Sequence, residues 1–543
     1  MEVTVFSAFV ASLAVCMALI PPLMACSARL RTVDLPDERK VHAVPIARIG
    51  GVALAAGPLM SVLFWAPKSQ VVTSYLIGAA IIWLLGVWDD RTPLDFKVKF
   101  FVQFVAALIV VWYGGLRLDR LPFWPDAALA PWVGVGLTVV ALLGVTNAVN
   151  LSDGLDGLAG GLCVLTFGAL AYLAHLADEW AITLIAVAVL GGLLGFLRFN
   201  TYPARVFMGD GGSQFLGFSA GVLAILLIRS DGAGSSPVLA LFILGLPIVD
   251  TIGVMAQRLA ERRSPFLPDK NHIHHKLLAA GFFHHEAVLA IYAVQAAMVT
   301  LALLLSGSSE AVMLATYAAI VLPILALFFL AGRGVRWKRP ERDRSRSIAV
   351  VRRLRASRWL TDTPLRLLGI GVPVFLALGV FLPRSVPTDF GVLAVVLFGL
   401  VLLGLAVFRR AAPFLVRVGL YVGGAFVLYL SDQASIGADW PVRTALNAFF
   451  GAAAILVLVA IRFQRGTRFE TTPLDYLLVF VAVMIPNLPE IGLGGTELGL
   501  LAAKLLVLFF AYELLLHALS ERLVQFGAVS LWVLLGLGIR AWW

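Results

Sequence analysis

The sequence is poor in charge and almost free of cysteine. Only 14% of its 543 residues are Asp, Glu, Lys or Arg, whereas soluble domains carry about 25%. The three cysteines, Cys16, Cys26 and Cys163, have no metal-binding spacing and form no disulfide framework. Short segments of alternating polar and apolar residues, which a β-barrel requires, are absent as well. These absences argue against a soluble domain, a disulfide scaffold and a barrel.

The sequence instead contains recurring apolar runs of about 20 residues, each long enough to cross a ~30 Å hydrocarbon core. We therefore predict an all-α polytopic integral membrane protein. The first run lacks a basic segment before it and is too long for a signal peptide, so we expect a retained helix. Eleven candidate spans precede residue 332: 4–25, 49–66, 71–88, 98–114, 132–149, 157–176, 181–198, 212–229, 238–257, 287–306 and 311–331. Six or seven follow: 365–382, 390–408, 412–430, 441–461, 473–487, 497–518 and 524–541.

A basic segment separates the two groups of spans. Residues 333–358 hold eleven Arg or Lys and two acids, which accounts for +9 of the net charge of +10. This location favours a cytoplasmic topology signal that could touch anionic lipid, and it argues against a nucleic-acid partner. We predict a membrane-embedded domain at 1–332, a basic cytoplasmic linker at 333–358 and a transmembrane extension of unknown role at 359–543.

The loops differ in polarity from one side to the other. If the basic loop 31–48 is cytoplasmic, then 89–97, 147–156, 199–211, 258–286 and 332–364 lie on the same side, and all of them are polar. The opposite loops are short and nearly neutral, except 115–131. The positive-inside rule thus predicts an outside N-terminus and a cytoplasmic face that carries every polar motif.

The first motif is GVWDDR at 86–91, where Asp89 and Asp90 end an apolar run. Lys97 and Lys99 follow at the start of the next run. Adjacent carboxylates at a helix end suit a Mg²⁺ site or its surroundings. An acidic loop that only ends a helix is an equally simple interpretation.

The second motif is NAVNLSDGLDGL at 147–158. Asn147, Asn150, Asp153 and Asp156 recur every three residues, which places them on one edge of a helical or 3₁₀ turn. Neutral and charged oxygens of this kind suit a hard cation. The alternative is an Asn/Asp-rich turn in which Asp156 caps the next helix.

The third motif is YPARVFMGDGGSQFLG at 202–217. Asp210 precedes Gly211 and Ser213 at the start of an apolar run. A glycine turn at a helix N-terminus suits phosphate. Phe207 could stack on a base, although ordinary interfacial packing is favoured by spacing alone.

The fourth motif, SPFLPDKNHIHHKLLAAGF at 264–282, clusters His272, His274 and His275. Three interpretations are open: Zn²⁺ binding, although the spacing matches no standard site and no cysteine is near, a solvated basic loop, or a set of donors for phosphate or sugar hydroxyls. Separately, Asp250 lies inside the run 238–257 and should face the bundle interior, and Pro247 could kink that helix. The residues leave its role open between structure and catalysis.

Together the loops bring carboxylates, amides, lysines and histidines to one membrane face. This inventory fits Mg²⁺-assisted phosphoryl chemistry on a polar substrate with a lipid partner. A transporter is the alternative from another class, but it should distribute polar residues through the midplane. In the extension, Lys504, Glu513 and His517 share one apolar run, where helix packing or a functional pair are both open.

These motifs, with DLPDERKVHAVPIARIGG at 34–51, resemble the polyprenyl-phosphate N-acetylhexosamine-1-phosphate transferase superfamily over residues 1–332. The HIHH form resembles the GlcNAc-1-phosphate branch more than the muramoyl-pentapeptide branch of peptidoglycan synthesis, which is the alternative. The resemblance implies transfer of a sugar 1-phosphate from a UDP-sugar to undecaprenyl phosphate, with release of UMP. It also implies Mg²⁺, which Mn²⁺ could replace, a bacterial inner-membrane location, and a start of cell-surface glycan synthesis. A homodimer is compatible with it.

The resemblance also implies roles for matching residues. Asp210 and Asn150 would be metal ligands, and Phe207 a uracil platform. The catalytic group would comprise Asp89, Asp90, Lys99, Asp153, Asp156, His272, His274 and His275. Substrate binding would add Asn147, Lys97, Arg39, His42, Gly211 and Ser213. Because a phosphate monoester is largely ionised at pH 7, we expect Asp89 and Asp90 to organise metal and lysine more than to remove a proton.

Overall fold

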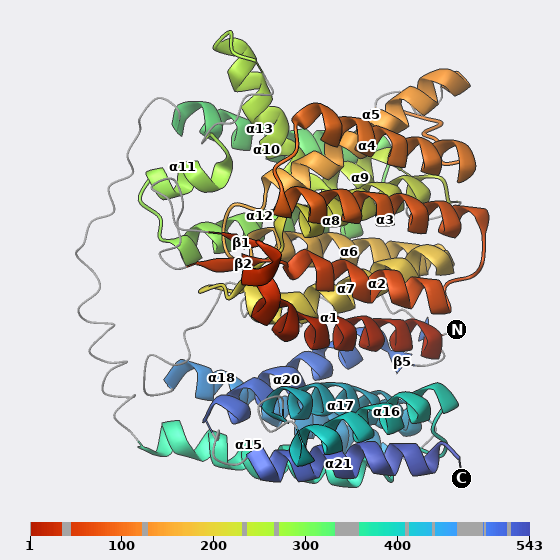
Figure 1. The fold of residues 1–543 in the computed structure, drawn as a ribbon, viewed down its shortest axis with the longest axis vertical. Coiled ribbons are helices and arrows are strands. Elements are labelled where there is room, and N and C mark those ends of the chain that lie inside the picture. The colour runs from red at the N-terminus through yellow and green to blue at the C-terminus, as the bar shows by residue number, and fades with distance from the viewer. Residues whose placement is uncertain are drawn as a thin grey trace. The chain divides into compact units, whose positions relative to one another are not determined.

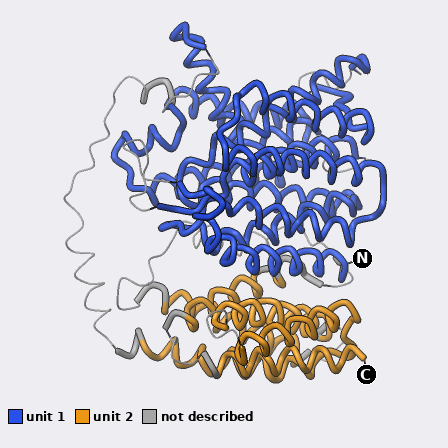
Figure 2. Tube along the Cα trace, in the orientation of Figure 1, with its two compact units in different colours: residues 1, 3–339 blue, residues 2, 340–543 orange. Residues whose placement is uncertain are grey.

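The computed structural model describes residues 2–34, 45–121, 129–230, 236–264, 271–331, 358–407, 412–436, 440–463, 492–493, 496–518 and 523–542. The chain divides into two compact units, Val3–Arg339 and Pro340–Trp543 (Figure 2). Both are built from long apolar helices, thirteen of which could cross a membrane by length and composition among the described residues. The prediction of an all-α multi-pass protein is therefore confirmed.

The helices of the N-terminal unit follow the predicted spans closely (Figure 1). They are α1 (Glu2–Leu30), α2 (Gly50–Trp65), α3 (Gln70–Arg91), α4 (Phe96–Leu108) with the π-helix η1 (Ile109–Tyr113), α5 (Pro131–Leu151), α6 (Leu158–Leu176), α7 (Trp180–Asn200), α8 (Gly209–Ile228), α9 (Pro237–Ile243), α10 (Gly245–Ala260), α11 (Ile273–Ala279), α12 (His284–Leu305) and α13 (Glu310–Ala331). The predicted boundaries match because the ends of the apolar runs coincide with the ends of the helices.

Helix α8 lies at the centre of this unit. It packs against α2, α3, α5 and α6, and all of its residues except Asp210 and Leu226 are buried. A helix that is apolar on every side belongs in a protein interior. The first turn of α8, which carries the third motif, is therefore enclosed by neighbouring helices.

A small sheet covers the entry to α8. Its strands are β1 (Val33–Asp34), β2 (Ile46–Arg48) and β3 (Val206–Phe207), in the order β1-β2-β3. Strands β1 and β2 are antiparallel, whereas β2 and β3 are parallel, with Arg48 opposite Phe207. The sheet joins the basic loop to the segment before α8, which the sequence did not predict.

The predicted span at 238–257 is sharply bent in the structure. The chain forms two helices, α9 and α10, which meet at Leu244 with a bend of 85°. Pro247 lies in the first turn of α10, where its missing N–H leaves no bond unmade. The backbone groups freed by the break are hydrogen-bonded by buried side chains. Gln295 accepts from the Leu246 N–H and donates to the Ile243 carbonyl, both at 2.9 Å.

The C-terminal unit contains α15 (Arg358–Gly379), α16 (Thr388–Ala406), α17 (Ala412–Ile436), α18 (Trp440–Phe463), α20 (Leu498–Ala518) and α21 (Leu523–Arg540), with the two-residue strands β4 (Gly492–Leu493) and β5 (Thr496–Glu497). The predicted run 473–487 lies outside the described residues. Helix α17 contacts all five other helices of this unit.

Two polar contacts join α17 to α20. Lys504 forms a buried ion pair with Asp432, and Tyr421 donates to Glu513 at 2.7 Å. A charge buried without a partner is strongly destabilising, so Lys504 and Asp432 require each other. The side chain of His517 lies outside the described residues, and its pairing with Glu513 stays a prediction.

We expect Gln295→Leu to destabilise the protein by about 1–3 kcal/mol, because the Leu246 N–H loses its only partner among the described contacts while staying buried. Thermal unfolding of the full chain in detergent measures this. Thr316→Val on α13 is the control, since its hydroxyl donates to the carbonyl of Val312 one turn earlier at an exposed position. Equal stability of both variants would mean that the break does not depend on Gln295.

Candidate active site

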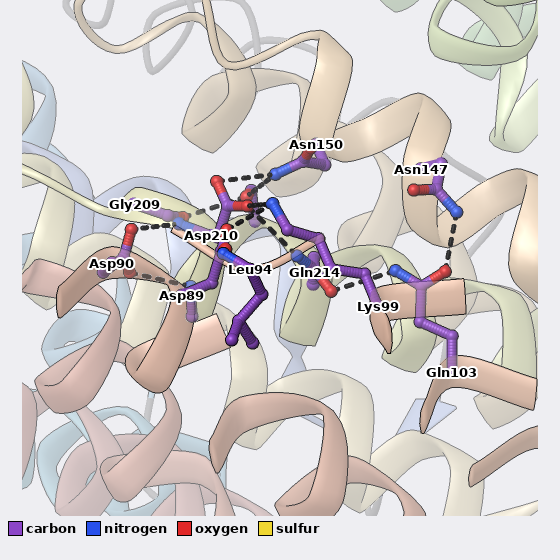
Figure 3. A network of polar contacts seen from close by, with 12 residues as sticks. Asp89, Asp90, Leu94, Lys99, Gln103, Asn147, Asn150, Gly209, Asp210 and Gln214 are labelled. Carbon is purple, nitrogen blue, oxygen red and sulfur yellow. Dashed lines mark hydrogen bonds and ion pairs between the residues drawn. The ribbon is translucent and has the colours of Figure 1, made fainter. Parts of the chain in front are cut away.

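The ends of four helices meet at one cluster of polar side chains (Figure 3). Asp89 and Asp90 come from the last turn of α3, and Lys99 from the start of α4. Asn150 comes from the end of α5. Asp210 comes from the first turn of α8. The structure therefore brings residues of three separate sequence motifs into contact.

The carboxylate of Asp210 is the point where these contacts converge. Its Oδ1 lies 3.4 Å from Arg48 Nη2 and 3.3 Å from Asn150 Nδ2. Its Oδ2 lies 3.2 Å from Lys99 Nζ and 3.3 Å from Gln214 Nε2. Four donors at these rather long distances surround one carboxylate without any of them making a short bond. This geometry leaves the carboxylate oxygens able to exchange partners.

Asp90 holds the N-terminus of α8. Its two oxygens accept from the backbone N–H groups of Asp210 at 2.8 Å and Gly211 at 3.0 Å. Arg48 lies 3.1 Å from the same carboxylate. A carboxylate is stabilised at a helix N-terminus, where free N–H groups and the dipole face it. The anion-binding turn predicted at Gly211 is thus occupied by a side chain of the protein itself.

Asp89 holds Lys99. One of its oxygens pairs with the Lys99 ammonium, and the other accepts from the Leu94 N–H at 2.7 Å. Lys99 also contacts Asp210, so it bridges α3 and α8. Since both oxygens of Asp89 have partners, the carboxylate is arranged to position a cation.

An amide chain extends from the cluster. Gln214 donates to Asp210, Gln103 donates to Gln214 at 3.0 Å, and Asn147 donates to Gln103 at 2.8 Å. Asn147 also bonds to the Leu143 carbonyl on its own helix. Two side chains, Gln103 and Gln214, therefore lie between Asn147 and Asp210 in this chain of hydrogen bonds. Asn147 holds Gln103 in place.

The turn after α5 carries Asp153 and Asp156. Asp156 accepts from the Ala204 N–H at 2.8 Å, and its own N–H donates to His284 at 3.2 Å. The first bond attaches the turn to the segment that leads into β3 and Phe207, and the second attaches it to the start of α12. Asp156 thus braces the backbone beside the expected base platform.

The HIHH segment lies against the same turn. His272 and His274 are buried, and the His274 ring occupies the space that a side chain at position 154 would need. The ring of His275 lies 4.2 Å from that of His274. The second and fourth motifs therefore form one surface, as their shared side of the membrane predicts.

Other predicted residues lie outside the cluster. Lys97 is exposed, with its ammonium 6.0 Å from the Phe96 ring. Ser213 is buried and accepts from Asn150 at 2.7 Å. Phe207 lies in β3, opposite Arg48. Arg39 and His42 lie outside the described residues. The substrate-binding roles of all these residues stay predictions.

Sequence reasoning missed two members of the cluster, Arg48 and Gln214. Arg48 is the last residue of β2, at the end of the basic loop and two residues before α2 begins. Nothing in its sequence position indicates a contact with α3 and α8. Gln214 follows Asp210 by four residues, a spacing that puts both on one helix face. That spacing could have identified Gln214.

Charge in the cluster is unbalanced. When Asp89, Asp90, Asp153 and Asp210 are ionised, Arg48 and Lys99 are the cations that oppose them among the described residues, which leaves two negative charges in excess there. Burial raises the pKa of Asp153 to about 7, with Arg48 opposing the rise and Asp210 and Asp90 adding to it. Burial would lower the pKa of Arg48, but Asp90 and Asp210 raise it above its usual value.

The raised pKa of Asp153 makes stability depend on pH. Its folded-state pKa of about 7 exceeds the unfolded value of about 3.9. The folded chain therefore binds more protons between these values. The contribution of Asp153 to stability falls as pH rises through this window, and its full cost is reached above about pH 7.

An excess of buried negative charge is suited to a divalent cation. Mg²⁺ commonly takes one or two carboxylates and completes its shell with water and substrate phosphate. Asp210 offers such a carboxylate, and a half-turn of the Asn150 amide would present its oxygen in place of its nitrogen. No group of three or more His, Cys, Asp or Glu with metal-binding geometry occurs in the described part of the chain. The residues fit Mg²⁺ as a pair of ligands.

The fold and the cluster define a multi-pass membrane protein whose ionised site is built from helix ends. Residues 72–228 match the family described as glycosyl transferase family 4. A probable undecaprenyl-phosphate N-acetylglucosaminyl 1-phosphate transferase of Bacillus subtilis (strain 168) is 38% identical over 288 residues, which cover 52% of this chain and 80% of that relative. The undecaprenyl-phosphate α-N-acetylglucosaminyl 1-phosphate transferase of Escherichia coli (strain K12) is 32% identical, covering 56% and 84%. That of Yersinia pestis is 32% identical, covering 48% and 74%. The chain belongs to glycosyl transferase family 4.

Close helix contacts hold the cluster and give a test. A methyl group at Gly86 of α3 would lie 2.5 Å from the Gly211 backbone of α8. We expect Gly86→Ala to separate the two helices and cost about 1–3 kcal/mol by overpacking. Thermal unfolding measures the loss. Gly144→Ala on α5 is the control, because nothing lies within 4 Å of that position. If Gly86→Ala is as stable as the control, the close contact between α3 and α8 at Gly86 does not contribute to stability.

Proposed function

We propose that the chain transfers an N-acetylhexosamine 1-phosphate from a UDP-sugar to undecaprenyl phosphate. The products are a polyprenyl diphosphate-sugar and UMP. The observation that carries the proposal is the Asp210 cluster, in which two cations and two amides surround one carboxylate at a membrane-helix end. The named relatives support the lipid acceptor and the aminosugar.

The two cations suit the hardest part of this reaction, which is to bring a phosphate dianion close to an anionic diphosphate. Lys99 and Arg48 each bridge two carboxylates. An incoming phosphate oxygen could replace Asp210 at either cation without leaving a charge unpaired. Asp89 and Asp90 hold the two cations in place, which supports organising roles for these carboxylates.

Asp210 and Asn150 would hold Mg²⁺. When bound, the ion supplies electrostatic stabilisation of the charge that develops on the transferring phosphoryl group. In the structure the Asn150 amide nitrogen donates to Ser213 and Asp210, so a half-turn of the amide would be needed to bring its oxygen to the ion. Phe207, beside Arg48, would receive the uracil ring, and the HIHH histidines would lie near the diphosphate or the sugar.

We place the site on the cytoplasmic face of the bacterial inner membrane, with the N-terminus outside. The uneven distribution of Lys and Arg among the loops supports this orientation. The cluster supports it too, because UDP-sugars are cytoplasmic substrates and the cluster lies at the helix ends that this orientation puts inside. The product would start a cell-surface glycan.

The test is release of UMP by the purified full-length protein in detergent with undecaprenyl phosphate. UDP-GlcNAc, UDP-GalNAc and UDP-MurNAc-pentapeptide are compared, each with Mg²⁺ and with a chelator. We expect Mg²⁺-dependent UMP release with a UDP-N-acetylhexosamine. Release with only the pentapeptide would move the chain to the peptidoglycan branch, and no release with any donor would reject the proposal.

Asp89→Asn separates an organising carboxylate from a general base. Because Asp89 holds Lys99, we expect kcat/KM to fall by at least roughly 10-fold at every pH between 6 and 9, a loss of more than about 1.4 kcal/mol of transition-state stabilisation. Steady-state UMP release measures it. Asp178→Asn, an exposed loop position at positive φ, is the matched control. A loss confined to low pH, where the lipid phosphate is protonated, would favour the base.

A further inference from the structure

A buried aspartate outside the cluster has two strong partners. Asp250, in α10, is 3% exposed. Its Oδ2 lies 2.9 Å from His272 Nδ1, and its Oδ1 accepts from the Ile273 N–H at 2.9 Å. Both partners belong to the start of α11, so the described contacts of this carboxylate are made with the HIHH segment. A carboxylate buried within an apolar helix is costly unless it is paired in this way.

The pairing fixes how the His272 ring is presented. An ionised carboxylate can only accept, so the His272 Nδ1 carries the hydrogen. The ring then turns its Nε2 away from Asp250. A carboxylate that orients a histidine in this manner sets both the tautomer and the ring plane.

The orientation passes along the segment to the turn. The rings of His272 and His274 are parallel, with 7° between their planes and 5.9 Å between their centroids. His274 is 2% exposed. Burial, with smaller effects of His275 and His272, lowers its pKa to about 3, so the ring is neutral. Its far edge presses on Gly154, between Asp153 and Asp156.

Gly154 completes the fit. A Cβ at this position would overlap the His274 Nε2, so only glycine lets the ring sit against the turn. On the other side of α11, Lys276 donates to Gln257 of α10 at 2.9 Å. The described hydrogen bonds thus attach the segment to α10 at Asp250, which reaches a histidine, and at Gln257, which reaches a lysine.

We infer that Asp250 is a positioning residue of the proposed transferase: it seats the HIHH segment on the Asp153–Asp156 turn and fixes the His272 tautomer. The catalytic consequence of this inference rests on the proposed function. The seating of the segment rests on the contacts of Asp250 and His274 alone. Asp250 touches no substrate in this scheme. It acts through His272, and through the packing of His274 on Gly154.

The test compares full-length Asp250→Asn with Gln257→Met, which removes the other attachment of α11 and leaves the histidines alone. An amide at 250 presents a donor to His272 Nδ1 and reverses the tautomer. We expect kcat in the UMP-release assay to fall roughly 10- to 100-fold, as for other residues that orient an active-site histidine, with KM for undecaprenyl phosphate unchanged. Asp250→Glu should recover part of the loss. Gln257→Met should keep wild-type kcat.

A second measurement needs no activity. Modification of histidines by diethyl pyrocarbonate, followed by mass spectrometry, reports whether His274 stays covered. We expect its modification rate to rise in Asp250→Asn and in Gly154→Ala, but not in Gln257→Met. Gly154→Ala disrupts the same contact from the side of the turn. It therefore tests the seating of the segment even if Asp250→Asn does not fold.

These outcomes are distinct. Protected His274 in both Asp250→Asn and Gly154→Ala overturns the seating. Wild-type kcat in Asp250→Asn overturns the positioning role, and so does an equal loss of kcat in Gln257→Met. If His274 becomes exposed in both variants but the wild-type protein releases no UMP, the proposed function is rejected and the seating stands.

Discussion

The N-terminus of α8 is a positive end that must be neutralised inside an apolar bundle, and Asp90 of α3 does this. The carboxylate takes two backbone N–H groups and the Arg48 guanidinium. Because the same turn of α8 carries Asp210, this one interaction fixes the distance between α3 and the residue on which Lys99, Asn150 and Gln214 converge. The remaining site residues are arranged around a helix end that is already placed.

Three polar side chains of the N-terminal unit share one principle. Each satisfies a backbone group that a helix end or a helix break leaves open. Asp90 serves the start of α8, Asp250 the start of α11, and Gln295 the break between α9 and α10. In an apolar surrounding an unmade backbone bond costs more than a side-chain interaction returns. The architecture of the site is thus largely the solution to a hydrogen-bonding problem.

The sequence predicts much of this because apolar length and loop polarity are local properties. The spans before residue 332 and the gathering of the motifs on one side follow from counting residues. The bend at Leu244 does not, because Gln295, which bonds the backbone groups that the bend leaves open, lies 49 residues after Leu246. Arg48 escapes notice for the same reason, since its partners lie on α3 and α8. The role of Asp250 was left open because a buried carboxylate in a run says only that a partner exists.

The bend between α9 and α10 fixes the rotational phase of α10. In an α-helix each residue turns the chain by about 100°. A single residue inserted or deleted between Leu246, which bonds Gln295, and Asp250, which bonds His272, would swing the carboxylate to another face of the helix. The number of residues between Leu246 and Asp250 is therefore fixed by the direction in which Asp250 must leave the axis of α10. Point substitutions can be absorbed there, whereas a change of length cannot.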